Sequence, residues 1–342
     1  MHLSSNMRVL VINVARIGDT LLSTPVITAL HQQLPEGTVD VVVHSGRKSV
    51  LEHLPGIRKL IGLTPKQLWW KRIFFKEKYD IAIVYGNDQS LLKLARKKAT
   101  YTIGFKQNDE RSNRLLDCAV PKPNQLMHAV HERLLLLAPL DIQTDKLELS
   151  YVVTPKETAW AEQWLMRQGV HQVGLVGLQM ASFPTKSYRD WPFERFSELV
   201  SGMLTRWPDL QFIVLGDKQS VQRAHDLSVA YPGKIISAAG KLSLRKSAAV
   251  MSHLSLYIGV DTGPTHLAGA MKIPMVSMYH CFHRGEFLAP LQHPYLEVVE
   301  HPALIARREA PMAELSASLV INAVERLSHR LPANHPMHPE QE

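Results

Sequence analysis

The sequence predicts an α/β protein made of two Rossmann-like, doubly wound domains that face a cleft. Short β-branched runs alternate with longer helical patterns, which predicts parallel sheets with right-handed crossovers. The alternation restarts after Pro155, near the middle of the chain. The 342 residues also exceed the size at which a single hydrophobic core usually stops growing. Two domains of ordinary size therefore explain the chain better than one large sheet.

The elements follow in order. Strands are expected at residues 8–14, 39–45, 80–86 and 100–105, and then at 173–179, 211–217, 234–238, 256–260 and 274–279. A last amphipathic helix is expected at 313–327. We therefore expect an N-terminal domain over 7–153, a C-terminal domain over 154–329 and a disordered tail over 330–342, whose histidines have no fixed ligand geometry.

Composition limits the class of protein and its partners. With 45% hydrophobic and 20% charged residues, the chain is typical of a globular protein. The net charge of +8 favours anionic partners, which include phosphates, acidic glycolipids, membrane surfaces and nucleic acid. Cys118 and Cys281 lie too far apart in sequence to suggest a disulfide framework or a thiolate zinc site.

Neither a signal peptide nor a membrane span is expected. The apolar run near the N-terminus soon meets Arg16, and no uninterrupted stretch reaches the roughly 20 apolar residues that cross a bilayer. We therefore expect a cytoplasmic protein whose contact with a membrane is peripheral.

The first informative motif is VLVINVARIGDTLLSTPVITAL, in which a buried strand ends at a tight turn and a helix begins. Gly18 permits close approach of the backbone, and Asp19 lies at or near the helix start, where a carboxylate is stabilised. Asp19 could simply cap the helix. It could also act as a general base that accepts the proton of an attacking hydroxyl. The turn is not a GxGxxG fingerprint, which disfavours binding of NAD.

The second motif is LYIGVDTGPTHLAGAMKIPMVSMY, in which a strand stops at Asp261 and a helix begins near Pro264. Thr262 can cap this helix, and Gly263 leaves the backbone accessible. The first N–H groups would then form an anion site suited to a diphosphate. His266 lies in the first turn, where it is either structural or a ligand of that anion.

A metal site is not expected. The segment HCFHRG at 280–285 offers two histidines but lacks a further pair of ligands at a recognised spacing, and the chain has no Asp-x-Asp motif. We expect neither a metal ion nor any other cofactor.

The RIGD turn and the later GVDTGPTHLAGA resemble the heptosyltransferases of glycosyltransferase family 9, which build the inner core of Gram-negative lipopolysaccharide. The resemblance covers nearly the whole chain. It implies a GT-B fold and a metal-independent, inverting transfer from ADP-L-glycero-D-manno-heptose, with Asp19 as the base. It also implies that Asp261, Thr262, Gly263 and His266 bind the diphosphate and the heptose.

The remaining donor-site residues depart from the family pattern. The family places a basic residue just before a Trp-Pro pair. In TKSYRDWPFERF that position falls to Arg189, with Lys186 as a nearby substitute. Some relatives hold the ribose with an acidic residue, where this chain offers Gln222, and Asp217 could share that role. A neutral hydrogen bond contributes only about 0.5–1.5 kcal/mol, so nucleotide selectivity stays open.

An aromatic and basic segment, KQLWWKRIFFKEKYD, is expected to contact the acceptor. It contains Lys71 and Arg72 among four large aromatic residues. Alone it could bind RNA or a membrane, or bury its aromatics as an ordinary helix. Because the acceptor implied by the resemblance is an anionic glycolipid, we expect Lys71, Arg72, Arg16 and Gly18 to contact it at the inner face of the inner membrane, and we expect no nucleic acid.

Two alternatives remain open from the sequence. One is another GT-B transferase that uses a different nucleotide sugar. The other is a noncatalytic binder of an anionic glycolipid, against which the intact Asp19 argues.

Overall fold

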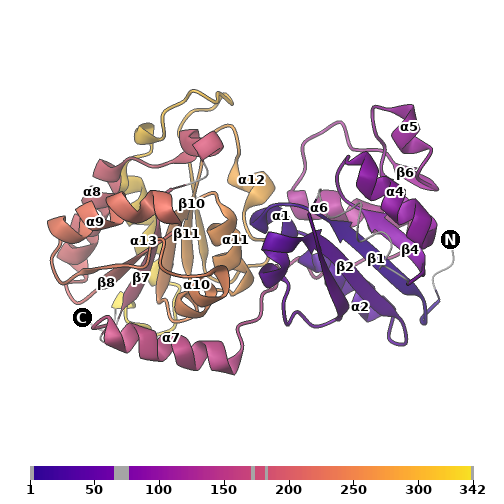
Figure 1. Ribbon diagram of the computed structural model, residues 1–342. Helices are drawn as coiled ribbons and strands as arrows, with labels where there is room; N and C mark the ends of the chain where they lie inside the picture. The colour runs from indigo at the N-terminus through magenta and orange to yellow at the C-terminus, as the bar shows by residue number, and fades with distance from the viewer. Residues whose placement is uncertain (1–3, 65–76, 171–173, 182–183, 340–342) are drawn as a thin grey trace. The chain divides into compact units, whose positions relative to one another are not determined.

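The computed structural model describes residues 4–64, 77–170, 174–181 and 184–339. The chain divides into two compact units, Met1–Val152 and Val153–Glu342. Figure 1 labels many of their elements, and each unit is described by itself.

Unit 1 is built on a parallel six-stranded sheet with the strand order β3-β2-β1-β4-β5-β6. Its strands are β1 (Arg8–Asn13), β2 (Thr38–His44), β3 (Ile57–Leu63), β4 (Tyr79–Val84), β5 (Ala99–Phe105) and β6 (Cys118–Val120). In the central strand β1, every residue after Arg8 is buried. Such continuous burial is typical of a parallel strand that is covered on both faces.

The helices of unit 1 connect these strands. They are α1 (Ile17–Leu21), α2 (Thr24–Gln33), η1 (Ser45–Val50), α4 (Gln89–Lys98), α5 (Glu110–Asn113), α6 (Ala129–Leu134) and η3 (Leu135–Leu140). Asp88 caps α4 by accepting a hydrogen bond from the N–H of Ser90 at 2.8 Å. Helix α4 thus begins directly after the carboxyl end of β4, as the doubly wound order requires.

Unit 2 repeats the same plan. Its parallel sheet has the order β12-β11-β10-β7-β8-β9; listed from the other edge, this is the order of unit 1 with each strand number raised by six. The strands are β7 (Leu175–Gln179), β8 (Gln211–Leu215), β9 (Ile235–Ser237), β10 (Leu256–Val260), β11 (Met275–Tyr279) and β12 (Leu296–Glu300). In both units the strand order reverses direction beside the first strand, and open α/β sheets bind ligands at that point.

Helices cover both faces of the second sheet. They are α7 (Pro155–Arg167), η4 (Pro184–Arg189), α8 (Phe193–Arg206), η5 (Lys218–Ser220), α9 (Val221–Ala230), α10 (Leu244–Met251), α11 (Gly263–Ala270), α12 (Gly285–Leu288), η6 (Met312–Glu314) and α13 (Ala317–Ser328). Helices α8, α9 and α13 pack together, as do α7, α10 and α11 (Figure 1). The core contains Trp191, which is fully buried and donates its indole N–H to the carbonyl of Leu315 at 2.8 Å.

The expected α/β class with two doubly wound sheets is confirmed, and the nine expected strands all have counterparts. Three strands were missed: β3, β6 and β12. All three are edge strands. An edge strand is short or carries charged side chains, because only one side of it pairs, and this weakens the apolar pattern that marks central strands.

The C-terminal segment differs from its expectation. The last helix begins at Ala317 rather than at 313, because Ser316 caps it by accepting a hydrogen bond from the N–H of Leu319. The expectation of a disordered tail is wrong for residues 330–339. Leu331 and Met337 are buried in the core of unit 2, and the ring of His335 lies 3.0 Å from the carbonyl of Ser255. Leu331 and Met337 thus belong to the same buried cluster as Val324 and Leu327 of α13.

We predict that Met337→Ala lowers the free energy of unfolding by about 2–5 kcal/mol, because it leaves a cavity in a packed core. Met166→Ala is the matched control, since Met166 is 63% exposed. Urea denaturation of the full chain measures both. Equal effects of the two changes would contradict the packing of the C-terminal segment.

Candidate functional site

The turn after β1 is held by a buried polar network. Asn13, the last residue of β1, donates its side-chain amide to the carbonyl of Asp19 at 3.1 Å and to the hydroxyl of Ser23 at 3.0 Å. Ser23 in turn donates to the carbonyl of Thr20 at 2.7 Å. All of these polar side chains except that of Asp19 are nearly inaccessible to solvent. The network fixes the start of α1 against the end of β1 and thereby positions Asp19.

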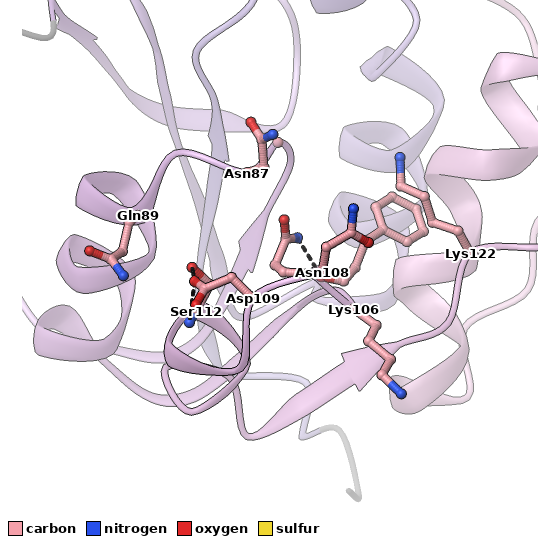
Figure 2. A pocket seen from close by; sticks show the side chains of 10 residues that line it. Asn87, Gln89, Lys106, Asn108, Asp109, Ser112 and Lys122 are labelled. Atoms are coloured by element: carbon pink, nitrogen blue, oxygen red, sulfur yellow. Dashed lines mark hydrogen bonds between the residues drawn. The ribbon is translucent and has the colours of Figure 1, made fainter.

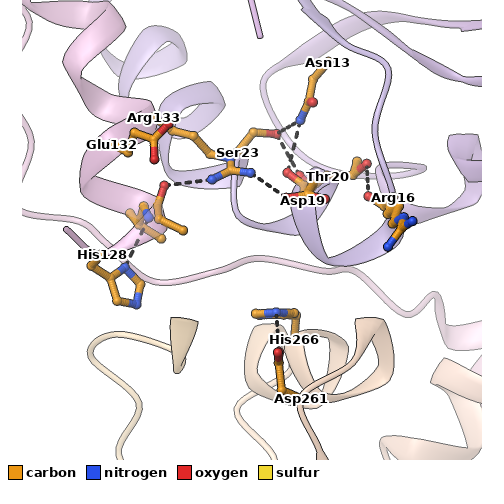
Figure 3. A network of polar contacts seen from close by, with 12 residues as sticks. Asn13, Arg16, Asp19, Thr20, Ser23, His128, Glu132, Arg133, Asp261 and His266 are labelled. Atoms are coloured by element: carbon orange, nitrogen blue, oxygen red, sulfur yellow. Dashed lines mark hydrogen bonds and ion pairs between the residues drawn. The ribbon is translucent and has the colours of Figure 1, made fainter. Parts of the chain in front are cut away.

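Asp19 is engaged by a residue far along the chain. The guanidinium of Arg133 donates to Oδ1 of Asp19 at 2.8 Å (Figure 3). Arg133 itself is anchored, because it also donates to the carbonyl of Ala129 at 2.9 Å, and Tyr85 donates its hydroxyl to the Arg133 carbonyl at 3.1 Å. The side chain of Asp19 is 48% exposed and that of Arg133 only 15%. Arg133 therefore orients a carboxylate that stays accessible to a ligand.

Asp19 is not the N-cap of α1. That position belongs to Arg16, whose carbonyl accepts hydrogen bonds from the N–H and the hydroxyl of Thr20. Asp19 lies in the first turn, and its carboxylate bonds Arg133 instead of a helix N–H. Gly18 is the second residue of α1, and the Arg16 side chain is exposed. The expected acceptor residues Lys71 and Arg72 lie outside the described residues.

In unit 2, the start of α11 is fixed to the end of β10. Thr265 donates its hydroxyl to the carbonyl of Val260 and lies 3.0 Å from the Tyr257 hydroxyl. Thr262 is the N-cap residue with an extended backbone, but its side chain makes no capping hydrogen bond to the helix. Gly263 is the first helical residue, and Pro264 follows it. The helix thus begins where the sequence predicts, and its first N–H groups lie at the carboxyl edge of the sheet.

Asp261 has a buried carboxylate with two basic neighbours, Arg189 and His266. Arg189 donates to its Oδ2 at 2.5 Å. Nε2 of His266 lies 3.6 Å from its Oδ1 (Figure 3). Burial alone would raise the pKa of Asp261, but His266, Arg189 and His283 together lower it below its usual range. The pair therefore stabilises the fold at neutral pH, and this contribution is lost as the pH falls from the ordinary pKa of an aspartate through the lower folded value.

His266 has a second polar atom that needs a partner. Its Nδ1 is buried and has no hydrogen-bond partner among the residues that the structure describes. A buried polar atom without a partner costs free energy, so it is commonly satisfied by water or by a ligand. His266 therefore has the geometry of a ligand-binding residue that Asp261 orients.

Tyr188 is the centre of a cationic cluster next to Asp261. The ammonium of Lys186 and the guanidinium carbons of Arg189 and Arg308 lie 5.9, 5.6 and 5.1 Å from the centroid of its ring. The ring of His283 stacks on Tyr188, with centroids 6.1 Å apart. Burial, followed by the charge of Arg189, lowers the pKa of His283 to about 4, so His283 is neutral at pH 7. The three cations make this region favourable for an anion.

The two residues expected at the nucleoside lie on the segment after β8. Asp217 caps η5 by accepting a hydrogen bond from the N–H of Gln219 at 3.0 Å, and it is exposed. Gln222 is exposed on α9 and donates to Asp226 at 2.8 Å. Gly216 precedes them with a φ of 133°, a backbone conformation that favours glycine. Both side chains are thus held by local contacts at the carboxyl end of β8.

The described residues contain no group of three or more His, Cys, Asp or Glu side chains that could hold a metal ion. Among these same residues, no helix is long and apolar enough to cross a membrane.

Sequence reasoning missed four residues of these two sites. Arg133 and Arg308 stand in no recognisable motif, and only the fold brings them to Asp19 and to Tyr188. Tyr188 directly precedes Arg189 in TKSYRDWPFERF, but its ring contacts with Arg308 and His283 depend on the fold. Asn13 gave a usable signal, because it is a polar residue at the end of a strand whose other positions are apolar.

Comparison with known proteins identifies relatives. A family model described as glycosyltransferase family 9 (heptosyltransferase) matches residues 70–310. Lipopolysaccharide heptosyltransferase 3 of Escherichia coli K12 is 26% identical, over 88% of this chain and 99% of the relative.

Two solved proteins share the fold. The first is a family 9 glycosyltransferase from Veillonella parvula, with a TM-score of 0.82, 21% identity and coverage of 95% of this chain and 98% of the other. The second is the E. coli heptosyltransferase WaaC with ADP, with a TM-score of 0.72, 20% identity and coverage of 94% and 100%. WaaC has also been solved with ADP-2-deoxy-2-fluoro heptose. The GT-B fold class is confirmed.

We predict that Arg189→Met lowers the free energy of unfolding by about 3–5 kcal/mol, because it leaves the buried Asp261 carboxylate without its main partner. In an Asp261→Asn background the same change should cost far less, because the neutral amide needs no counter-charge. Urea denaturation of the two single variants and the double variant gives the coupling energy. Additive effects would show that the two side chains do not form the pair described here.

Proposed function

The chain belongs to glycosyltransferase family 9, the heptosyltransferases, and from that membership we propose that it transfers heptose from an ADP-heptose to the inner core of lipopolysaccharide. The proposed transfer inverts the anomeric carbon and needs no metal ion. One observation carries this proposal: a half-exposed carboxylate, Asp19, is held at the end of β1 by a buried network and by Arg133.

Asp19 is the proposed general base. Its Oδ1 accepts from Arg133, and its Oδ2 has no hydrogen-bond partner among the described residues. Oδ2 would accept the proton of an acceptor hydroxyl as the hydroxyl oxygen attacks the anomeric carbon of the heptose. The bond between that carbon and the diphosphate oxygen breaks on the opposite face, and ADP departs with the electron pair. Attack from the face opposite to the leaving group accounts for inversion.

The proposed donor site lies in unit 2, at the start of α11. The N–H of Gly263 and the positive end of the helix dipole favour a diphosphate, and the nearby guanidinium of Arg189 adds a positive charge. Asp261 would repel phosphate if it were unpaired. It is instead buried against Arg189 and His266, so its proposed role is to orient these two side chains. Nδ1 of His266 would then donate to or accept from the sugar or the diphosphate.

Metal independence rests on the cations around Tyr188. Charge grows on the departing ADP, and preorganised donors and cations stabilise it as a divalent ion would. Arg189 is the better candidate of the two basic residues that the sequence left open, because it contacts Asp261 directly at the end of β10. The ammonium of Lys186 lies 5.9 Å from the centroid of the Tyr188 ring, at the edge of the same cationic cluster. We assign it a supporting role.

Unit 1 is the proposed acceptor-binding unit and unit 2 the proposed donor-binding unit. Arg16, Gly18, Lys71 and Arg72 are the proposed acceptor residues, and Thr262, Asp217 and Gln222 are proposed on the donor side. A net charge of +8 supports peripheral contact with the anionic inner face of the inner membrane, and hence a cytoplasmic location.

A second candidate function is the transfer of a different sugar from another nucleotide. Gln222 supports this second candidate. Its exposed side-chain amide already donates to Asp226, so it would bind a ribose hydroxyl only weakly.

A matrix of donors and acceptors tests the proposal. ADP-heptose and other nucleotide sugars are incubated with truncated core lipopolysaccharides in the presence of EDTA, and the products are identified by mass spectrometry. Transfer of heptose from ADP-heptose alone is the expected result. No product with any heptose donor would overturn the proposal, and activity that appears only after magnesium is added would overturn metal independence.

We predict that Asp19→Asn lowers the rate of transfer about 10²–10⁴-fold, because the amide cannot accept the proton. Folding stability should change by less than about 1 kcal/mol, because the ion pair with Arg133 is largely exposed on the Asp19 side. Steady-state rates and thermal unfolding measure the two effects.

Asp117→Asn is the control, since Asp117 is also a partly exposed aspartate paired with an arginine, Arg96. It should transfer heptose at the wild-type rate. A wild-type rate for Asp19→Asn would show that Asp19 has only a structural role.

A further inference from the structure

The cations near Tyr188 do not all contribute net charge to their surroundings. Arg189 donates to Oδ2 of Asp261 at 2.5 Å, and the side chain of Asp261 is only 4% exposed. Asp190 is paired in the same way, 3.3 Å from Arg223. Opposite charges in direct contact cancel most of each other's field at a distance. Arg189 therefore offers hydrogen bonds to a ligand, but its positive charge is already compensated.

Arg308 carries a charge that no carboxylate compensates. Its guanidinium carbon lies 5.1 Å from the centroid of the Tyr188 ring, nearer than the charged groups of Arg189 and Lys186. Within the described part of the chain Arg308 makes no ion pair, and the exposed carboxylate of Glu309 beside it makes none either. A guanidinium only donates, so the group that satisfies it is an acceptor and is best an anion.

The segment that carries Arg308 is held by groups that follow β11. The buried ring of His280 accepts a backbone N–H at Nδ1, at 3.1 Å, so its Nε2 carries the proton and donates to the carbonyl of Ala310 at 2.8 Å. Burial lowers the pKa of His280, so the ring is neutral at pH 7. The thiol of Cys281 donates to the carbonyl of Arg307 at 3.3 Å. Carbonyls on both sides of Arg308 thus have fixed partners.

A second buried histidine holds the same segment from the end of β12. His301 accepts the N–H of Ala303 at Nδ1, at 3.1 Å, and its Nε2 lies 3.1 Å from the carbonyl of Pro311. Only 1% of His280 and 3% of His301 is exposed, so solvent does not compete for these bonds. The backbone around Arg308 is therefore preorganised, and a charge placed on it needs little rearrangement to bind a ligand.

A cation in unit 1 shows what compensation looks like. A cavity of about 680 Å³ at the carboxyl ends of β4 and β5 has a lining that includes Asn87, Lys106 and Lys122 (Figure 2). The ammonium of Lys122 lies 5.0 Å from the centroid of the Phe105 ring, a contact much like that of Arg308. Lys122 also lies 3.1 Å from Glu132, which neutralises it. Contact with an aromatic ring thus does not by itself make a charge available.

We propose that Arg308 binds the diphosphate of the donor and supplies the net positive charge that stabilises the departing nucleoside diphosphate. When the bond between the anomeric carbon and the diphosphate oxygen breaks, the electron pair stays on the oxygen, and the leaving group gains one negative charge. An uncompensated cation stabilises that charge more than a paired one does. The inference rests on the proposed function for the position of the donor in unit 2.

Titration calorimetry of the full chain with ADP, at low salt, tests the contact. Arg308→Gln should weaken the binding of ADP about three- to thirtyfold, because a charge-assisted hydrogen bond from an exposed side chain is lost. Arg308→Lys should weaken it less than about threefold, because the charge is kept. The effect of Arg308→Gln should shrink at high salt, because exposed charges are screened.

Arg307→Gln is the matched control. Arg307 is the adjacent exposed arginine, and its side chain makes no ring contact or ion pair within the described residues. This variant should bind ADP like the wild type. Wild-type affinity in Arg308→Gln, an equal loss in Arg307→Gln, or an equal loss in Arg308→Lys would each overturn the proposal. A lower Tm of Arg308→Gln with unchanged ADP affinity would show that Arg308 only packs on Tyr188.

The proposed role in the departure of the nucleotide predicts a second difference. Free ADP is more negative than a sugar-linked diphosphate, because its terminal phosphate ionises a second time with a pKa of about 6. Arg308→Gln should therefore weaken the binding of ADP more than that of ADP-heptose, and lower kcat more than it raises the donor KM. Equal weakening of both ligands would overturn the role in departure.

This inference and the proposed function fail separately. If the wild-type chain binds ADP but transfers no heptose, the proposed function fails, and the variants at 307 and 308 still decide the diphosphate contact. If ADP does not bind, GDP and UDP take its place in the titrations, and no binding of any of the three overturns the inference. If the wild-type chain is active but Arg308→Gln binds ADP normally, only the role of Arg308 fails.

Discussion

Parallel pairing of every strand in each sheet is the constraint on which both sites depend. Because each crossover returns the chain to the same end of the sheet, all strands of a unit finish at one edge. The turns after β1, β4 and β5 therefore lie side by side in unit 1, and those after β7, β8 and β10 lie along one edge in unit 2. The backbone N–H and C=O groups of a central parallel strand are hydrogen-bonded to the neighbouring strands. Polar groups that can contact a ligand are therefore concentrated where the strands end.

At these edges the structure holds charged groups by different means. Asp19 is half-exposed, so its ion pair with Arg133 costs little desolvation and contributes mainly orientation. Asp261 is almost completely buried, so its charge requires the guanidinium of Arg189. An accessible carboxylate can accept a proton from a ligand, whereas a buried and paired carboxylate can only position its neighbours. The same residue type thus stands in two different environments, and the roles proposed for Asp19 and Asp261 follow from that difference in burial.

The strands that sequence patterns identify are the buried central ones. Strand β10 reads as a strand because all five of its residues are buried and most are apolar, whereas β3 carries Arg58 and Lys59 on an edge. The packing of the C-terminal segment was not predicted, for a related reason. Its burial rests on Leu331 and Met337, which are too few and too widely spaced to give a periodic signal. Tertiary packing decides whether such segments are ordered, since their local preference for a helix or a strand is weak.

The sequence by itself determined the fold class, nine of the twelve strands that the structure describes and the local chemistry of two turns. RIGD and VDTGPTH could be interpreted because strand end, glycine, capping residue and helix start all lie within a few residues of one another. Only the tertiary structure decided which partners these turns receive. Arg133 is 114 residues from Asp19, and Arg189 is 72 residues from Asp261. Lys106 and Asn87 likewise line one cavity only because β4 and β5 are neighbours in the sheet. Local interactions set the turns, but the order of strands sets which turns meet, and that order depends on packing over the whole unit.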